Sequence, residues 1–208
     1  MTAIENITAD MDWRMGELGS LKTIPHRYHM EEQHIAMLKR YIVPAIYGLW
    51  EGFVKNTILV YIEEINKAEV PVNSICLNTL IYMTDIDDNL KLSTERKHKE
   101  KKERFIKNFQ NLLATPVNMK LKVITESNVN LEVANHLLES FNIETLPDVY
   151  DGKLNKLLNF RNAIAHGESA ISVGEKEINE FSQLIVELMS EIAERVEKGL
   201  LSKSYLSN

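Results

Sequence analysis

The chain has 208 residues, of which 44% are hydrophobic and 26% are charged, with a formal net charge of −6. This apolar content excludes a disordered chain, and a total of 8 Gly and 5 Pro excludes collagen-like and low-complexity proteins. The acidic balance argues against a protein that coats nucleic acid non-specifically. No apolar run is long enough to span a membrane, no signal peptide is evident, and the single Cys76 indicates a reducing compartment. We therefore expect a cytoplasmic protein with no membrane contact.

Apolar residues spaced by three and four predict helices along most of the chain. The first helix is expected over about residues 5–21, with Pro25 ending it. The second, over about residues 30–68, has the widest apolar stripe, which is typical of a central helix that is contacted on several sides. Pro44 lies within this segment, so we expect either a kink or two helices that meet there.

The middle of the chain is less regular. A shorter helix is expected over about residues 71–83, and its expected inward residues are Leu77, Leu80 and Ile81. The segment at about 88–104 is rich in Lys and Arg and predicts an exposed basic loop that leads into another short helix. Residues 119–125 alternate in polarity, which predicts a short strand or an extended arm.

Three more helices are expected over about residues 131–141, 147–166 and 172–198, with Gly167 ending the second of them. No repeat of fixed period is present. The sequence therefore predicts a single all-α domain over residues 1–208, a helical bundle with a long central helix, in which the basic loop is the only obvious linker.

The helix over residues 151–167 carries a charge on its apolar face. The apolar residues expected on that face are Leu154, Leu157, Leu158, Ile164 and Ala165. Arg161 lies in the middle of it, where a helix that only needed packing would carry Leu. Because burying an unpaired guanidinium is expensive, Arg161 predicts a nearby anion, either a ligand or a core carboxylate such as Glu51.

A polar ridge adjoins this face. It consists of Asn155, Asn159, Asn162 and His166, spaced by four, three and four residues. On an ideal helix His166 is about 140° from Arg161. Asn155 and Asn159 are expected either to line a cleft or to bond to a neighbouring helix. For His166 the alternative to a functional role is a helix-end imidazole near exposed carbonyl groups.

These residues resemble a known motif. The hexapeptide Arg161-Asn162-Ala163-Ile164-Ala165-His166 is similar to the R-x4-6-H motif of the HEPN superfamily, in the form with a polar residue directly after the Arg. The resemblance extends to Trp13-Arg14, Leu49-Trp50-Glu51-Gly52-Phe53-Val54-Lys55, Tyr61 and Ser127-Asn128, and so to most of the chain.

The resemblance implies an all-α, HEPN-like bundle that dimerises and acts as a metal-independent endoribonuclease, either a toxin or an antiphage defence effector. It implies Arg161 as the phosphate-binding residue, His166 as general acid or base, and Asn162 as the residue that positions them. The implied partners are an RNA substrate, a second copy of the chain, and an antitoxin or regulatory protein, with no cofactor and no metal. The alternative is a non-catalytic HEPN-type module that binds a nucleotide, RNA or a protein.

The chemistry of RNA cleavage fits these roles. RNA supplies its own nucleophile, the 2′-hydroxyl, so cleavage requires proton transfer and stabilisation of the charge that builds on the phosphate. An imidazole suits the first task, and a guanidinium suits the second. The expected products carry a 2′,3′-cyclic phosphate and a 5′-hydroxyl.

Other candidate residues are weaker. Asn155, Asn159, Lys97 and Lys99 are candidates for substrate contacts, the two lysines because the basic loop is either an RNA-binding or partner-binding segment or simply a solvated surface. Trp13, Tyr47 and Trp50 are expected in the core rather than on a base-stacking surface. His26, His29 and His34 do not predict a metal site, because no Cys or carboxylate completes a recognised spacing.

Overall fold

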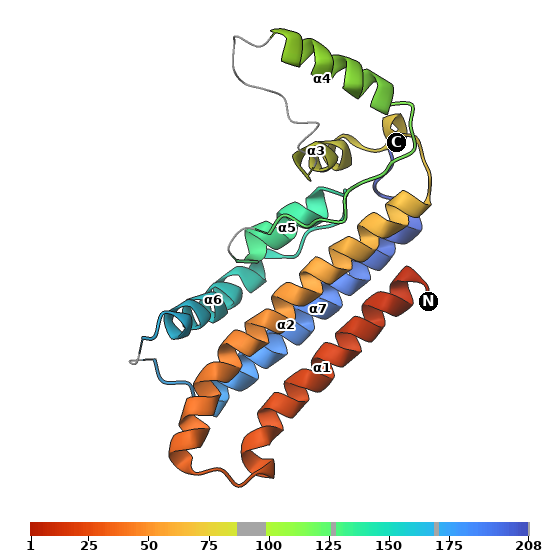
Figure 1. The fold of residues 1–208 in the computed structure, drawn as a ribbon. Helices are drawn as coiled ribbons and strands as arrows, with labels where there is room; N and C mark the ends of the chain where they lie inside the picture. The colour runs from red at the N-terminus through yellow and green to blue at the C-terminus, as the bar shows by residue number, and fades with distance from the viewer. Residues whose placement is uncertain (87–98, 126–127, 169–170, 208) are drawn as a thin grey trace. The chain divides into compact units, whose positions relative to one another are not determined.

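The protein is described by a computed structural model that covers residues 1–86, 99–125, 128–168 and 171–207. These residues form seven α-helices and two short 3-10 helices (Figure 1). They contain no β-strand, only two isolated bridges between single residue pairs. The prediction of an all-α fold is confirmed. None of the described helices is both long enough and apolar enough to cross a membrane.

The helices in chain order are α1 (Ala3–Arg27), α2 (Glu32–Lys67), α3 (Leu77–Ile86), α4 (Lys99–Leu112), α5 (Leu131–Glu139), α6 (Asp151–Ala165) and α7 (Glu175–Ser202). The 3-10 helices are η1 (Val72–Ser74) and η3 (Asp148–Tyr150). The chain divides into two compact units, and α2, α5 and α7 contribute to both. The first unit comprises residues 1–57, 125–135 and 146–194, and the second comprises residues 58–124, 136–145 and 195–208. The expectation of a single domain stays a prediction.

The first unit is built around the N-terminal part of α2, which contacts α1 on one side and α6 on another. The largest buried side chains there are Tyr47, Trp50, Phe53 and Phe181. The Trp50 Nε1 donates to the Val129 carbonyl at 2.9 Å, and the Tyr47 hydroxyl accepts from the Val129 N–H at 2.8 Å. Two side chains of α2 therefore fix the segment that precedes α5.

The second unit has an aromatic core of its own. Phe141 packs against Tyr61 and Tyr82 with ring centroids 5.2 and 5.0 Å apart. The Asn66 side chain holds Met119 through two hydrogen bonds, one to its carbonyl at 2.9 Å and one from its N–H at 2.7 Å. Residues 119–125 have no strand pairing, so the short strand expected there is absent, and the segment bends at Leu121, where the Lys122 N–H bonds to the Lys120 carbonyl at 2.8 Å.

The expected end of the first helix is wrong, and one of the two alternatives expected at Pro44 is excluded. Pro25 does not end α1, which continues to Arg27. Proline removes only its own N–H donor, and the Tyr28 N–H still bonds to the Ile24 carbonyl at 3.2 Å. Pro44 lies within α2, which is one continuous helix rather than two helices that meet.

The inward face predicted for α3 is also wrong. Leu77 and Ile81 are 69% and 49% exposed, and Leu80 is half-buried. The buried residues of α3 are Thr79, Tyr82, Met83 and Ile86. This ten-residue helix has apolar side chains on several sides, so its contacts decide which face is buried: Thr79 donates to the Ser140 carbonyl at 3.0 Å, and Tyr82 packs on Phe141.

Most of the basic loop expected at about 88–104 lies outside the described residues, as does Lys97. From Lys99 onward the chain forms α4, the short helix expected after the loop. Phe105 and Phe109 stack on each other along α4 with centroids 5.8 Å apart. Lys99 is exposed and pairs with Glu103 at 3.6 Å.

Candidate active site

Helix α6 ends where the glycine at its C-terminus predicts. Gly167 has φ of +81°, a left-handed conformation that glycine adopts without steric cost. The Glu168 N–H bonds to the Ala163 carbonyl at 2.9 Å and the Gly167 N–H to the Ile164 carbonyl at 3.1 Å, which is the Schellman pattern. His166 is therefore the C-cap residue of α6.

The apolar face of α6 opens to solvent toward this end. Its buried residues are Leu154, Leu157, Leu158 and Ile164, as predicted. Arg161, one turn after Leu158 on the same face, is half-buried, and Ala165 is exposed, contrary to prediction. Ile164 is buried, but Arg161 is only half-buried and His166 is exposed, so these two motif residues lie at the edge of the packed core.

The Arg161 guanidinium has two partners among the described residues. Its central carbon lies 4.9 Å from the centre of the Tyr47 ring, and its Nη1 donates to the Asn162 Oδ1 at 2.8 Å. No described carboxylate lies within ion-pair distance of it. Glu51, the carboxylate considered as a structural partner, instead pairs with Lys55 at 2.6 Å. The positive charge of Arg161 is thus left without a counter-ion in the described part of the chain.

Tyr47 forms a rigid, neutral support under this guanidinium. Only 2% of the residue is exposed. Burial raises the pKa of Tyr47 to about 12, and the hydrogen-bonded Glu51 carboxylate contributes to the rise, against opposing effects of the Val129 N–H and Arg161. The ring therefore stays uncharged at neutral pH, with its electron-rich face available to a cation.

The other N–H groups of Arg161 are accessible. None of its nitrogens is among the buried side-chain atoms that lack a hydrogen-bond partner in the described residues. Asn162 is its one hydrogen-bond partner among the described residues, so Nε and Nη2 have no described acceptor and are not fully buried. They are free to bind an anion that approaches from the open side of the helix.

His166 is exposed and lies five residues after Arg161. The helix stays regular through Ala165, so the backbone positions of the two residues are about 7.5 Å apart along the axis. No described residue hydrogen-bonds to the imidazole. Such an imidazole is able to exchange a proton, and the accessible guanidinium is able to bind an anion.

The family comparison bears on this motif directly. A family model described as MAE_28990-like HEPN matches residues 3–205. The chain belongs to this HEPN family. Comparison with curated proteins and with solved structures found no match. The match covers both units and all seven helices, so the whole described chain belongs to the HEPN fold.

The remaining predicted site residues of this HEPN protein are placed as follows. Asn162 is half-buried and contacts Arg161 directly. Asn155 donates to the Asp151 carboxylate at 3.0 Å within α6, and Asn159 is exposed. Neither asparagine bonds to a neighbouring helix among the described residues, so both lie on the accessible side of α6. Lys99 belongs to the second unit, whereas the motif belongs to the first.

Two residues that contact the motif helix were not predicted as site residues. Tyr47 was expected to be a core residue; it is one, and it also contacts Arg161. Arg40 was not considered, yet its Nη2 donates to the Glu168 carbonyl at 2.6 Å, two residues after His166. Arg40, Tyr47 and Glu51 are spaced by seven and four residues, which places them on one face of α2.

Proposed function

We propose that this HEPN protein is a metal-independent endoribonuclease in which Arg161 and His166 act on one scissile phosphate. The observation that supports the proposal is the charge of Arg161, which is accessible and has no described counter-ion. A folded protein keeps such a group when a ligand supplies the missing anion. RNA phosphate is that ligand in the reaction that this family's motif implies.

The reaction needs the RNA, these side chains, and water to exchange the proton that His166 does not transfer. The 2′-oxygen attacks the adjacent phosphorus as its proton leaves, and the bond from phosphorus to the 5′-oxygen breaks as that oxygen gains a proton. His166 takes up or delivers one of these protons. Arg161 binds the non-bridging oxygens as negative charge increases on them. Asn162 and Tyr47 hold the guanidinium through its Nη1 and its flat face.

The experiment is incubation of the protein with total RNA in EDTA. The wild type is compared with His166→Ala and with His34→Ala, an exposed histidine at the start of α2, as a matched control. We expect cleavage by the wild type and by His34→Ala and none by His166→Ala, with unchanged helical content in all three. Retention of more than a few per cent of the rate by His166→Ala would exclude it as general acid or base. RNA binding without cleavage by the wild type would instead support the non-catalytic module.

We also propose that the active unit is a homodimer with the α6 helices near the two-fold axis. An apolar face that opens to solvent at Arg161 suits a position where two copies meet at a cleft. One self-complementary surface is enough to form such a dimer. Specific activity per chain should fall on dilution through the dissociation range, with light scattering reporting the oligomer. A demonstrated monomer that cleaves RNA as fast per chain would contradict the shared site.

A further inference from the structure

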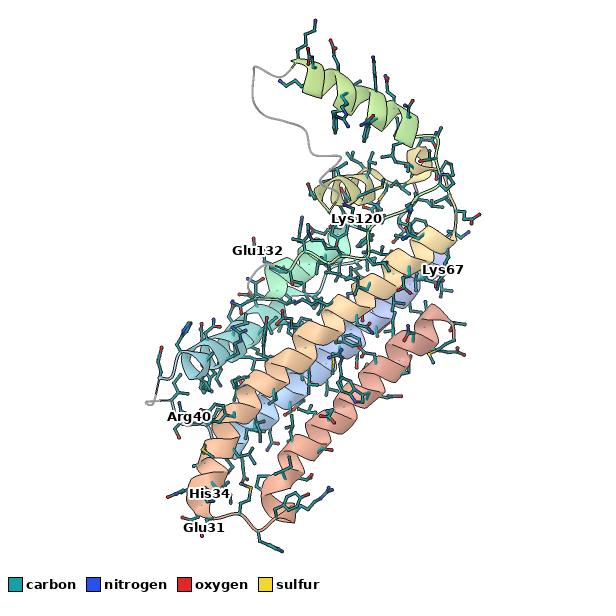
Figure 2. The ribbon with its side chains drawn as sticks, in the orientation of Figure 1. Glu31, His34, Arg40, Lys67, Lys120 and Glu132 are labelled. Carbon is teal, nitrogen blue, oxygen red and sulfur yellow. The ribbon has the colours of Figure 1, made fainter. Side chains whose placement is uncertain are left out.

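Arg40 is the second arginine of the first unit that meets the motif segment, and it does so from α2 (Figure 2). Its Nη2 donates to the Glu168 carbonyl at 2.6 Å, in the turn that follows His166 and Gly167. Its Nε is buried and has no hydrogen-bond partner in the described residues. The Nη2 group of Arg40 therefore has a protein partner. Its buried Nε has lost its hydrogen bond to water and has no protein acceptor in its place.

The charge of Arg40 has no counter-ion either. No described carboxylate lies within ion-pair distance of it. The adjacent Lys39, by contrast, pairs with the Glu175 carboxylate at 3.2 Å. Arg40 Nη1 is not among the buried atoms without a partner, so this end of the guanidinium remains accessible. Arg40 thus shares with Arg161 an accessible and uncompensated positive charge.

The contacts of the two arginines flank His166 in the sequence. Arg161 contacts Tyr47, and seven residues later Glu168 contacts Arg40, which precedes Tyr47 by seven residues. Helix α6 therefore runs antiparallel to the N-terminal part of α2 (Figure 1). His166 lies between these two contacts in the chain.

We propose that Arg40 is a second phosphate-binding residue, which binds the RNA backbone on the opposite side of His166 from Arg161. The inference rests on the proposed ribonuclease function and extends its site onto α2. A guanidinium presents several N–H groups in one plane, so Arg40 donates to the Glu168 carbonyl and to a phosphate oxygen at the same time. The same residue thereby holds the turn next to His166 and binds the substrate.

The test is the salt dependence of RNA affinity, measured in the His166→Ala background so that the RNA stays intact. Arg40→Gln removes the charge, Arg40→Lys keeps it, and Lys39→Gln is the matched control, because it removes the neighbouring charge that Glu175 already neutralises. For a single-stranded RNA, the slope of log K against log salt is negative, and loss of one phosphate contact reduces its magnitude by about 0.7. We expect this decrease for Arg40→Gln and an unchanged slope for Arg40→Lys and Lys39→Gln.

The possible results separate the two functions of Arg40 and the two proposals. If Arg40 only holds the turn, Arg40→Gln slows cleavage in the otherwise wild-type protein but leaves the slope unchanged, and the inference is overturned. A slope that falls equally for Lys39→Gln also overturns it, because the effect is then general electrostatics. If the wild type cleaves no RNA and the parent variant binds none, the proposed function fails, and the inference fails with it. Thermal melting of each variant shows whether a change in the salt slope is caused by unfolding.

Discussion

Helix α2 is contacted by one arginine from α1 and by one from α6, and the two arginines have different partners. From α1, Arg14 is only 9% exposed and has a carboxylate partner: its Nε pairs with Asp10 at 2.9 Å and its Nη1 donates to the Leu49 carbonyl at 3.0 Å. Gly52 makes room for it, since a Cβ at that position would lie 2.6 Å from the Arg14 Nη1. The Trp13 ring, 57% exposed rather than in the core as expected, lies 5.2 Å from the guanidinium carbon.

Arg161, which contacts α2 from α6, is less buried than Arg14 and has no carboxylate partner among the described residues. It has the ring of Tyr47 and the amide of Asn162 in place of a carboxylate and a carbonyl. Compensation of the charge, rather than the degree of burial, therefore distinguishes the two arginines. The contact between α1 and α2 is closed and stabilises the fold, whereas the contact between α6 and α2 leaves donors available to a ligand.

Substitution of each arginine should give the largest difference between the two contacts, one variant losing activity and the other losing stability. We expect Arg161→Ala to lower the cleavage rate by about 10²–10³-fold, as for loss of a donor that stabilises the transition state. Its free energy of unfolding should change by less than about 1 kcal/mol, because only a partly exposed cation–π contact is lost. Arg14→Ala should cost about 3 kcal/mol, because it leaves Asp10 and the Leu49 carbonyl without their partner.

Urea unfolding and a cleavage assay under conditions where each variant is folded measure both quantities. The folded fraction of Arg14→Ala should keep most of the wild-type rate. If Arg161→Ala is as destabilising as Arg14→Ala, Arg161 is a structural residue and the comparison fails.

Variants of Tyr47 separate its ring from its hydroxyl. Tyr47→Phe keeps the surface that contacts Arg161 but leaves the buried Val129 N–H without an acceptor, so stability should fall by about 1–2 kcal/mol with little change in kcat. Tyr47→Leu also removes the ring, and loss of a cation–π contact of up to about 1 kcal/mol lowers kcat by up to roughly fivefold more. Single-turnover cleavage by the two folded variants is the measurement. Equal rates for Phe and Leu would show that the ring does not position Arg161.

Two glycines of α2 sharpen the description of the closed contact. Gly52→Ala forces Arg14 away from the Leu49 carbonyl, which we expect to lower stability by about 1–2 kcal/mol. Gly48 is exposed, and a Cβ added there would meet no atom within 4 Å, so Gly48→Ala should stabilise the helix by about 0.5–1 kcal/mol. Thermal or urea unfolding gives the sign of each change. A stabilising Gly52→Ala would mean that Arg14 is not held in place.

Helix α6 was largely predictable from the sequence because its features are local. The spacing of Leu154, Leu157 and Leu158 gives the buried face, and Gly167 gives the end of the helix. Arg161 was identifiable because it interrupts that face. The extent to which the face opens near Ala165 was not predictable, since it depends on where the neighbouring helices end.

The contribution of α2 could not be predicted, because this helix is apolar on most sides. Its pattern marks Tyr47 as buried but does not say which neighbour lies against it. Arg40 looked like one of many surface charges, and only its contact with the turn after α6 distinguishes it. The prediction of the inward face of α3 was wrong for a similar reason. This short helix has Leu77 and Ile81 on one side and Tyr82 on another, so its own sequence does not determine which side is buried.

The end groups of the RNA fragments test the central claim most directly. If the 2′-hydroxyl attacks the phosphate between Arg161 and His166, the products made in EDTA carry 2′,3′-cyclic phosphate and 5′-hydroxyl ends, and these ends are absent with His166→Ala. Fragments that carry 5′-phosphate and 3′-hydroxyl ends, or identical fragments from His166→Ala, would contradict the account.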